Sequence, residues 1–237
     1  MSINRLYRKF FCRGGHGVHS PFVYDLITTV IEEKKPYYCY ERLSAIRKQL
    51  EKNSTRIDLD YCVYMVNDVL KKHCLTEHED QLLFRLANRF QPKNTYVIGS
   101  DMGLALLYLT SWSEYANCIV FEPHQSMAHF ACEIVDKYSS ASIDIRVFHD
   151  TEIEKDEKID FIVLNSPFCE EVYKIFLRHI NDNSIMVVTG INDSQKNRNT
   201  WKAVCSDPKV TVTIDLFSIG IASFNPKLPR KTYKSIF

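Results

Sequence analysis

The hydrophobic pattern of this chain changes near residue 95, and that change constrains the fold more than any other feature. Beyond it, short apolar runs of strand length alternate with helical patterns of about 10 to 15 residues. The runs are Thr95–Ile98, Cys118–Phe121, Ile143–Phe148, Phe161–Leu164 and Ile185–Thr189. Such alternation is typical of βα units, and nearly continuous apolar strands indicate helices on both faces of a parallel sheet. The sequence therefore predicts an α/β fold with a doubly wound, mostly parallel sheet.

The end of the chain has a different pattern. Val210–Phe217, Ile219–Phe224 and Thr232–Phe237 follow one another without room for helices. A parallel crossover needs about a dozen residues, so we expect all three segments to pair as antiparallel strands at one edge of the sheet.

Residues 1–92 are predicted to form an N-terminal helical cap region, and residues 93–237 a second domain. Ser20 and Pro21 have the N-cap and N1 preferences that begin a helix over 21–34. Apolar stripes at helical spacing predict further helices through Cys39–Leu50 and Ile57–Val69.

A capping box is predicted at Thr76 and Glu79, because each side chain can bond the other's backbone N–H. The helix that it begins carries a leucine-rich stripe and ends before Pro92.

The composition is that of an ordinary globular protein. The 237 residues are 45% apolar and 25% charged, with 30 Lys and Arg against 29 Asp and Glu, which disfavours a dedicated nucleic-acid-binding protein. The eight cysteines form no C-x-x-C pair. Neither a signal-peptide core nor a run of about 18 apolar residues is present, so we expect a cytoplasmic protein with reduced thiols and no membrane span.

Glycine is scarce, and five of the seven glycines fall in two short segments, 14–17 and 99–103. The second segment follows a predicted strand and precedes a helix, where a nucleotide-like ligand can lie against a doubly wound sheet. Its spacing is G-x-x-x-G rather than G-x-G-x-x-G, and no phosphate loop of the type G-x-x-x-x-G-K-[ST] occurs. The alternative is that both glycines only ease a tight turn.

Two acidic residues follow the next strands. Glu122 ends the strand after the glycine turn, about 20 residues on, where a carboxylate can accept both hydroxyls of a ribose. Asp150 follows the third strand, where an adenine amino group can be met. The alternatives are a surface glutamate before Pro123, which starts a helix, and a loop aspartate without a ligand.

Taken together, these segments resemble a class I S-adenosylmethionine-dependent methyltransferase. The segments that carry the resemblance are Val97–Gly103, Phe121–Glu122, His149–Asp150, Ile159–Ser166 and the antiparallel ending. More narrowly, Arg13–Phe22 (RGGHGVHSPF) resembles the N-terminal segment of a bacterial O-methyltransferase-like group. The resemblance implies a Rossmann-like sheet of the seven-stranded type and S-adenosylmethionine as cofactor.

The resemblance also implies site residues. The glycine turn would face the methionine part and the ribose, Glu122 would hold the ribose hydroxyls, and Asp150 would lie beside adenine. Asn165 would border the place where methyl donor and acceptor meet. The full set of implied cofactor contacts is Gly99, Ser100, Asp101, Met102, Gly103, Glu122, Pro123, Asp150, Asn165 and Ser166.

Three departures from the family pattern bear on the activity. Val97 stands where the family usually has an acid, two residues before the first glycine. Asn165 and Gly190 stand where metal-dependent relatives carry acids, and a hard cation needs carboxylate oxygens, so we expect no metal site. An alternative is a catalytically impaired cofactor-binding or interaction protein that keeps the fold.

His16 and His19, in the N-terminal glycine-rich segment, are the candidate catalytic bases. Histidine titrates near neutral pH, and flanking glycines allow a loop to close over a substrate. The alternative is an ordered lead-in whose histidines bond the backbone.

The sequence thus predicts a metal-independent methyltransferase acting on an unidentified acceptor. O-methylation of a small molecule is what the resemblance suggests, with nucleic acid disfavoured as a partner. A homodimer contact through the helical region is a further possibility. A nicotinamide oxidoreductase lacks its third glycine, and a covalent hydrolase lacks the G-x-S-x-G elbow.

Overall fold

The computed structural model describes residues 15, 17–59, 62–147, 153, 158–165 and 170–237. The chain divides into two compact units, each described by itself. The central unit is Lys35–Glu152, and the split unit joins Met1–Lys34 to Ile153–Phe237. This division differs from the expected boundary at residue 92, and that boundary stays a prediction.

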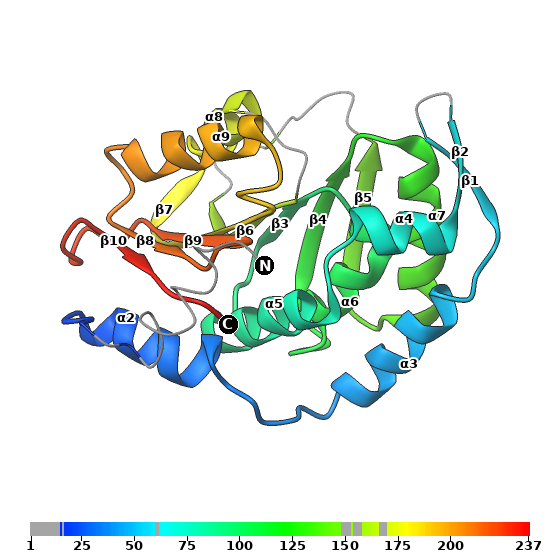
Figure 1. Cartoon of the computed structure of the whole chain (residues 1–237), viewed down its shortest axis with the longest axis horizontal. Helices are drawn as coiled ribbons and strands as arrows, with labels where there is room; N and C mark the ends of the chain where they lie inside the picture. Colours follow the sequence, from blue (N-terminus) through cyan, green and yellow to red (C-terminus); the bar gives the residue numbers. More distant parts are fainter. Residues whose placement is uncertain (1–14, 16, 60–61, 148–152, 154–157, 166–169) are drawn as a thin grey trace. The chain divides into compact units, whose positions relative to one another are not determined.

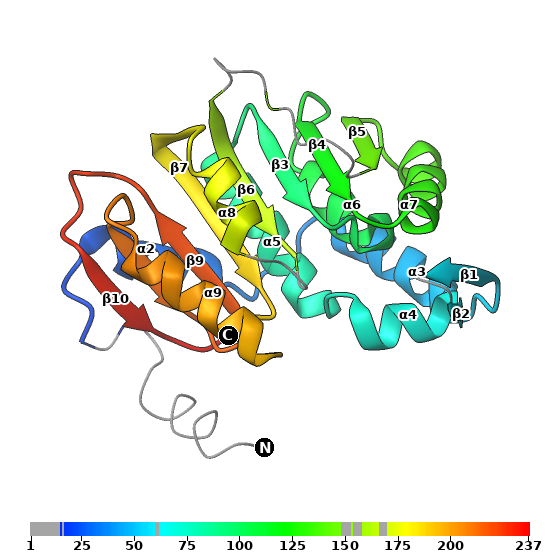
Figure 2. The ribbon, with the colours of Figure 1, turned by 90° about the horizontal axis from the view of Figure 1, so that it is seen from above.

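The central unit contains a parallel sheet in the strand order β3-β4-β5 (Figures 1 and 2). All four residues of β3 are buried, as expected of a strand with helices on both faces, and α7 packs on β4 and β5. The elements of the unit, in chain order, are α3 (Tyr40–Leu50), β1 (Arg56–Leu59), β2 (Cys62–Met65), α4 (Val66–His73), α5 (Glu77–Phe90), β3 (Thr95–Ile98), η2 (Asp101–Gly103), α6 (Leu104–Thr110), β4 (Asn117–Glu122), α7 (Gln125–Tyr138) and β5 (Ser142–Val147).

The capping box at the start of α5 is confirmed. The Thr76 Oγ1 accepts the Glu79 N–H at 3.4 Å, and the Glu79 carboxylate accepts the Thr76 N–H at 2.9 Å. The helix ends at Phe90, before a left-handed Gln91 with φ 46°.

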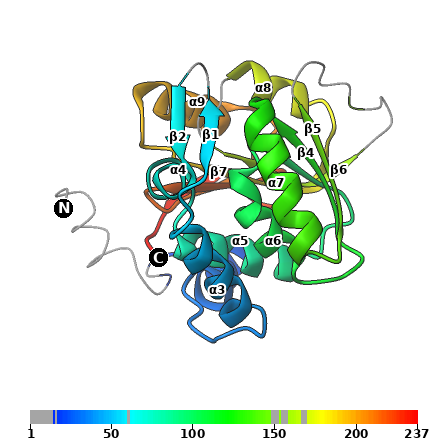
Figure 3. The same ribbon diagram turned by 90° about the vertical axis from the view of Figure 1, so that its right-hand side faces the viewer.

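The helix predicted through Ile57–Val69 is wrong in its first half. β1 and β2 pair there as an antiparallel hairpin, with Ile57 opposite Tyr64, and only the following segment is helical, as α4 (Figure 3). A spacing of four residues is a multiple of two, so an apolar stripe at that spacing also fits one face of a strand. The β-branched and aromatic residues Val63 and Tyr64 then favour the strand.

The helix predicted over 21–34 is shorter and irregular. Ser20 caps α2 (Pro21–Leu26), accepting the Val23 N–H at 3.4 Å, and the chain continues as a π-helix, η1 (Ile27–Ile31). The hydroxyls of Thr28 and Thr29 donate to the carbonyls of Tyr24 and Asp25. Such bonds compete with the regular backbone ladder and can distort a helix.

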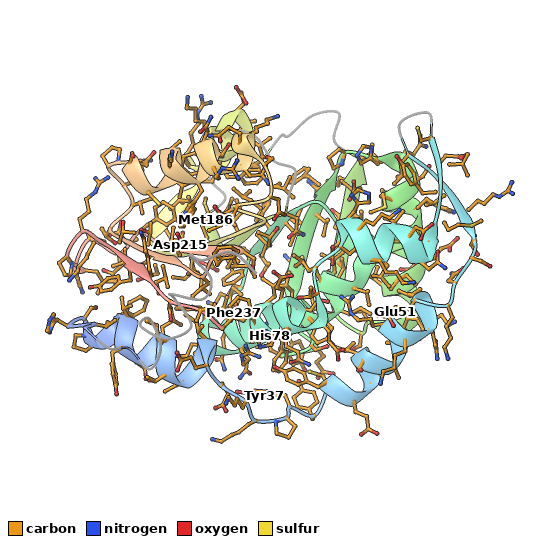
Figure 4. The ribbon with its side chains drawn as sticks, in the orientation of Figure 1. Tyr37, Glu51, His78, Met186, Asp215 and Phe237 are labelled. Carbon is orange, nitrogen blue, oxygen red and sulfur yellow. The ribbon has the colours of Figure 1, made fainter. Side chains whose placement is uncertain are left out.

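The split unit contains a mixed sheet in the strand order β10-β8-β9-β7-β6. β6 and β7 are parallel, while β9 is antiparallel to both of its neighbours, β7 and β8. Met186 on β7, labelled in Figure 4, is fully buried in this sheet. Besides α2 and η1, its elements are β6 (Ile159–Leu164), α8 (Glu170–Phe176), β7 (Ile180–Thr189), α9 (Gln195–Ser206), β8 (Val212–Asp215), β9 (Ile219–Ser223) and β10 (Lys231–Lys234).

The antiparallel ending is confirmed for β8 and β9 but wrong for β10. β10 runs parallel to β8, with Lys231 opposite Val212 and Lys234 opposite Asp215. Both edges of β9 are already taken, so the free edge of β8 is the one that β10 joins. Parallel strands need a segment between them that brings the chain back to its starting edge, usually a helix. Between β8 and β10 this segment is the strand β9.

Among the residues with described positions, no helix is both long and apolar enough to cross a membrane.

We predict that Gly220 on β9 is required by the packing of α9. A Cβ at this position would lie 2.5 Å from Cη2 of Trp201, well inside van der Waals contact. Gly220→Ala is expected to lower the free energy of unfolding by about 1–3 kcal/mol, because the overpacked ring must move. Urea unfolding of Gly220→Ala, Trp201→Leu and the double variant would measure this. The double variant is expected to lose less unfolding free energy than the sum of the losses in the two single variants. Strictly additive losses would contradict the prediction.

Candidate functional site

The candidate site is built on the turn between β3 and α6, which is the glycine turn (residues 99–103). Four of its five residues are left-handed, with φ 84° at Gly99, 50° at Asp101, 54° at Met102 and 86° at Gly103. Left-handed backbone is costly for residues other than glycine, so surrounding bonds must hold this conformation. The Gly99 N–H donates to the Phe121 carbonyl at 2.8 Å, which ties the turn to the end of β4.

The second glycine of the motif is favoured by close packing as well as by its φ. A Cβ on Gly103 would lie 3.1 Å from Cβ of Ile134 and 3.2 Å from the Ala131 carbonyl oxygen, both on α7. The G-x-x-x-G spacing therefore has a structural explanation that needs no ligand.

Glu122 binds the glycine turn directly. Its Oε2 accepts the Ser100 N–H at 2.7 Å and the Ser100 hydroxyl at 2.6 Å, and its Oε1 accepts the His124 N–H at 3.0 Å. Ser100 is fully buried and Glu122 is 3% exposed. A carboxylate has about four acceptor positions, so three such bonds leave Oε1 able to accept one further donor. The turn and the acidic end of β4, singled out separately in the sequence, lie together.

The other expected contacts in the central unit differ in exposure. The Met102 side chain is fully buried, whereas Pro123, after β4, is exposed. Asp101 is buried, and its Oδ1 accepts the Leu75 N–H at 3.0 Å from the segment between α4 and α5.

A buried cluster of charges adjoins Asp101. Arg47, on α3, donates through Nη2 to Asp80 Oδ2 at 2.5 Å and to the Leu75 carbonyl at 2.8 Å. One oxygen of each carboxylate, Oδ1 of Asp80 and Oδ2 of Asp101, has no hydrogen-bond partner among the described residues. The cluster thus places one guanidinium beside two buried carboxylates.

Burial dominates the titration of this cluster. Desolvation raises the pKa of Asp101 to about 6, although the Leu75 N–H and the charge of Arg47 oppose the shift. The pKa of Asp80 also lies well above its ordinary value, first through desolvation and then through the charge of Asp101. Desolvation and the neighbouring Asp101 raise the pKa of Cys74, so its thiol stays protonated.

Sequence reasoning missed Arg47 and Asp80. A signal for both exists in the helical stripes. Arg47 follows Leu43 by four residues and precedes Leu50 by three, on the buried face of α3. Asp80 precedes Leu83 by three residues, on the buried face of α5. Charged residues at buried positions of an amphipathic helix are seldom found without a partner.

The remaining expected residues belong to the split unit or lie outside the described residues. Asn165 follows β6, is buried, and accepts the Thr189 hydroxyl at 3.2 Å. His19 is exposed. His16, Asp150 and Ser166 lie outside the described residues.

Within the part of the chain that the structure describes, no group of three or more His, Cys, Asp or Glu side chains is arranged to hold a metal ion. The expectation of a metal-independent reaction stays a prediction.

A separate pocket of about 360 Å³ lies in the central unit at the carboxyl ends of α6 and α7. Tyr38, Arg42, Trp112 and Tyr138 help to line it, and none of the site residues expected from the sequence does.

Comparison with solved structures identifies the fold. No family model and no curated protein sequence matches the chain. An O-methyltransferase from Bacillus cereus, in complex with S-adenosylhomocysteine (SAH), is similar to this chain, with a TM-score of 0.57 and 14% identity. The match covers 85% of this chain and 97% of that chain. The O-methyltransferase TomG from Streptomyces achromogenes, in complex with SAM, has a TM-score of 0.55 and 13% identity over 94% and 99% of the two chains.

A putative caffeoyl-CoA O-methyltransferase from Staphylococcus aureus is similar with a TM-score of 0.59 and 12% identity, over 79% of this chain and 93% of that one. The chain has the Rossmann-like fold of these methyltransferases. The resemblance of the N-terminal Arg13–Phe22 segment to a narrower group is tested neither by these structures nor by a family model, and it stays a prediction.

We predict that Asp101 makes the stability of the protein depend on pH. Its pKa is about 6 in the folded chain, above the value of about 4 expected in the unfolded chain. The folded state therefore binds more protons between these values, and the free energy of unfolding falls by about 1–3 kcal/mol as the pH rises from about 4 to about 6.

Asp101→Asn is expected to reduce this slope, because the side chain no longer titrates. The measurement is guanidinium unfolding at several pH values. Asp144→Asn, which removes an equal charge from a side chain that is 51% exposed, serves as the control. An unchanged slope in Asp101→Asn would show that Asp101 does not titrate in this range.

Proposed function

We propose that this protein is an S-adenosylmethionine-dependent methyltransferase. The observation that carries the proposal is the Glu122 carboxylate bound to Ser100 of the glycine turn, at the carboxyl ends of the adjacent parallel strands β3 and β4. Ligands of open α/β sheets bind at this edge, and an acid at the end of the second strand accepts ribose hydroxyls. The similar O-methyltransferases from Bacillus cereus and Streptomyces achromogenes were solved with SAH and SAM.

The hydrogen-bonding groups of Glu122 and of the glycine turn fit an adenosyl compound. Glu122 keeps an acceptor position for a hydroxyl, and Gly99, partly exposed and without a Cβ, allows a ligand to approach the backbone. We propose that the cofactor contacts are those expected from the sequence, namely Gly99, Ser100, Asp101, Met102, Gly103, Glu122, Pro123, Asp150, Asn165 and Ser166.

When bound, the cofactor supplies an electrophilic methyl group on its sulfonium. The protein's part in such a displacement is to hold the acceptor at near-attack distance and to remove the proton of an acceptor hydroxyl. We propose His16 or His19 as the base that takes this proton. The proposed reaction is metal-independent O-methylation of a small molecule.

We predict that Glu122→Ala weakens binding of SAH. Hydrogen bonds to a charged acceptor contribute about 1.5–3 kcal/mol each, so the dissociation constant is expected to rise roughly 10- to 100-fold. Isothermal titration calorimetry with SAH and SAM measures the effect. Glu114→Ala, an exposed acid of the same unit, is the control and is expected to bind as the parent protein does.

Two results would overturn the proposal. One is the absence of binding and of any thermal shift at millimolar SAH and SAM, in protein that is folded by circular dichroism. The other is unchanged affinity in Glu122→Ala.

We also predict that one of the two N-terminal histidines is needed for transfer. A base positioned on the acceptor contributes about 100- to 10,000-fold, so His16→Ala or His19→Ala is expected to lower the rate by at least about 100-fold and to leave SAH affinity nearly unchanged. Transfer of labelled methyl to a panel of hydroxyl-bearing small molecules measures the rate. His129→Ala, on an exposed face of α7, is the control.

Full activity in both histidine variants would contradict the assignment of the base. Tight SAH binding without transfer to any acceptor would instead favour a catalytically impaired protein that binds the cofactor.

A further inference from the structure

Arg47 joins two helices to the segment between α4 and α5. Its side chain comes from α3 and is almost fully buried. Nη2 donates to the Asp80 carboxylate on α5 at 2.5 Å and to the Leu75 carbonyl at 2.8 Å. The Leu75 peptide is therefore fixed on its carbonyl side by a charged donor.

Leu75 also holds the glycine turn, through its backbone N–H. The Leu75 N–H donates to Asp101 Oδ1 at 3.0 Å. Asp101 and Met102 are both left-handed, with φ 50° and 54°, although neither is glycine. A backbone in this region persists only where its surroundings over-determine it, and the Leu75 bond is one such restraint.

The charges around Asp101 also depend on Arg47. The groups that act on Asp101 are Arg47 from α3, Cys74 beside Leu75, and Glu79 on α5, while Asp101 in turn acts on Asp80. Tyr108 on α6 is buried near Asp80 and Arg47. Among these groups the guanidinium is the cation; it bonds the Asp80 carboxylate and interacts electrostatically with the Asp101 carboxylate.

A buried ion pair is weak grounds for a purely stabilising role. Replacing such a pair with apolar side chains of similar volume is often neutral or stabilising, because both charges must be desolvated in the folded state. The Leu75 carbonyl, by contrast, loses its charged donor when Arg47 is replaced, and Asp101 loses the neighbouring cation.

We propose that Arg47 is a positioning residue for the proposed cofactor site, acting through Leu75 and Asp101 on the conformation of the glycine turn. The inference rests on the proposed function, because it assigns the turn to cofactor binding. Arg47 itself touches neither cofactor nor acceptor in this account.

The test uses the double variant Arg47→Met with Asp80→Leu, which removes both charges of the ion pair and leaves the Leu75 N–H as the hydrogen-bond donor to Asp101. The single variant Arg47→Lys keeps a cation but loses the planar donor that spans Asp80 and Leu75. The control is Arg146→Met, which removes an exposed arginine paired with Asp144 in the same unit. Three quantities are measured: the thermal midpoint, the SAH dissociation constant, and the amide NMR shifts of Gly99 and Gly103 without ligand.

The double variant is expected to keep a thermal midpoint near that of the parent protein, while its SAH dissociation constant rises about tenfold. The Gly99 and Gly103 amide signals are expected to move in the double variant and, less far, in Arg47→Lys, but not in the control. Where the double variant unfolds, Arg47→Lys gives the same test.

Unchanged glycine signals and unchanged SAH affinity in a folded variant would overturn the inference and leave the proposed function standing. Glycine signals that move in a protein whose parent binds no SAH would support the role of Arg47 in the turn and reject the proposed function. If SAH affinity falls only in variants whose thermal midpoint is also lowered, Arg47 has a general structural role and the inference is overturned.

Discussion

The bond between Glu122 and Ser100 is the interaction on which the candidate site depends. β3 and β4 are parallel neighbours, so their carboxyl ends meet at one edge of the sheet, and the buried N–H of Ser100 would lack a partner there without the Glu122 carboxylate. That carboxylate holds the glycine turn and keeps an acceptor position free. A carboxylate has about four acceptor positions, so one position remains for a ribose hydroxyl in the proposed complex.

A second buried carboxylate, that of Asp101, also restrains the conformation of the glycine turn. Asp101 turns its side chain to Leu75 rather than outward, and the Arg47–Asp80 pair sits beside it. Burying these charges costs free energy, which the raised pKa values of Asp80 and Asp101 reflect. Local strain and buried charge in one place are typical of positions kept for a site rather than for stability.

Regular periodicity made some parts of the fold predictable. β3 was found because its apolar run is buried on both faces, and the Thr76–Glu79 box because its two bonds are local. β5 was found from its apolar residues too, although it is an edge strand whose residues are exposed or half-buried. The β1–β2 hairpin was missed because a stripe at four-residue spacing fits both a helix and a strand face. The pairing of β10 with β8 was missed because it depends on which sheet edge is free, a property of the assembled sheet.

The candidate site was predictable where its chemistry lies at the ends of strands. The order strand, glycine turn, helix and the acid at the end of β4 singled out the turn and Glu122 as two separate candidate ligand contacts. The direct bond between Ser100 and Glu122 is a finding of the structure. The Arg47 cluster was not found, because its members come from three separate elements and meet only in the tertiary structure. Val97, singled out in the sequence as a departure from the resemblance, is fully buried in β3.

The most direct test of this account is a crystal structure of the protein with SAH. The account predicts the adenosyl group at the glycine turn, with a ribose hydroxyl within hydrogen-bond distance of Glu122 Oε1. An adenosyl group bound elsewhere, or a ribose that makes no contact with Glu122, would contradict it.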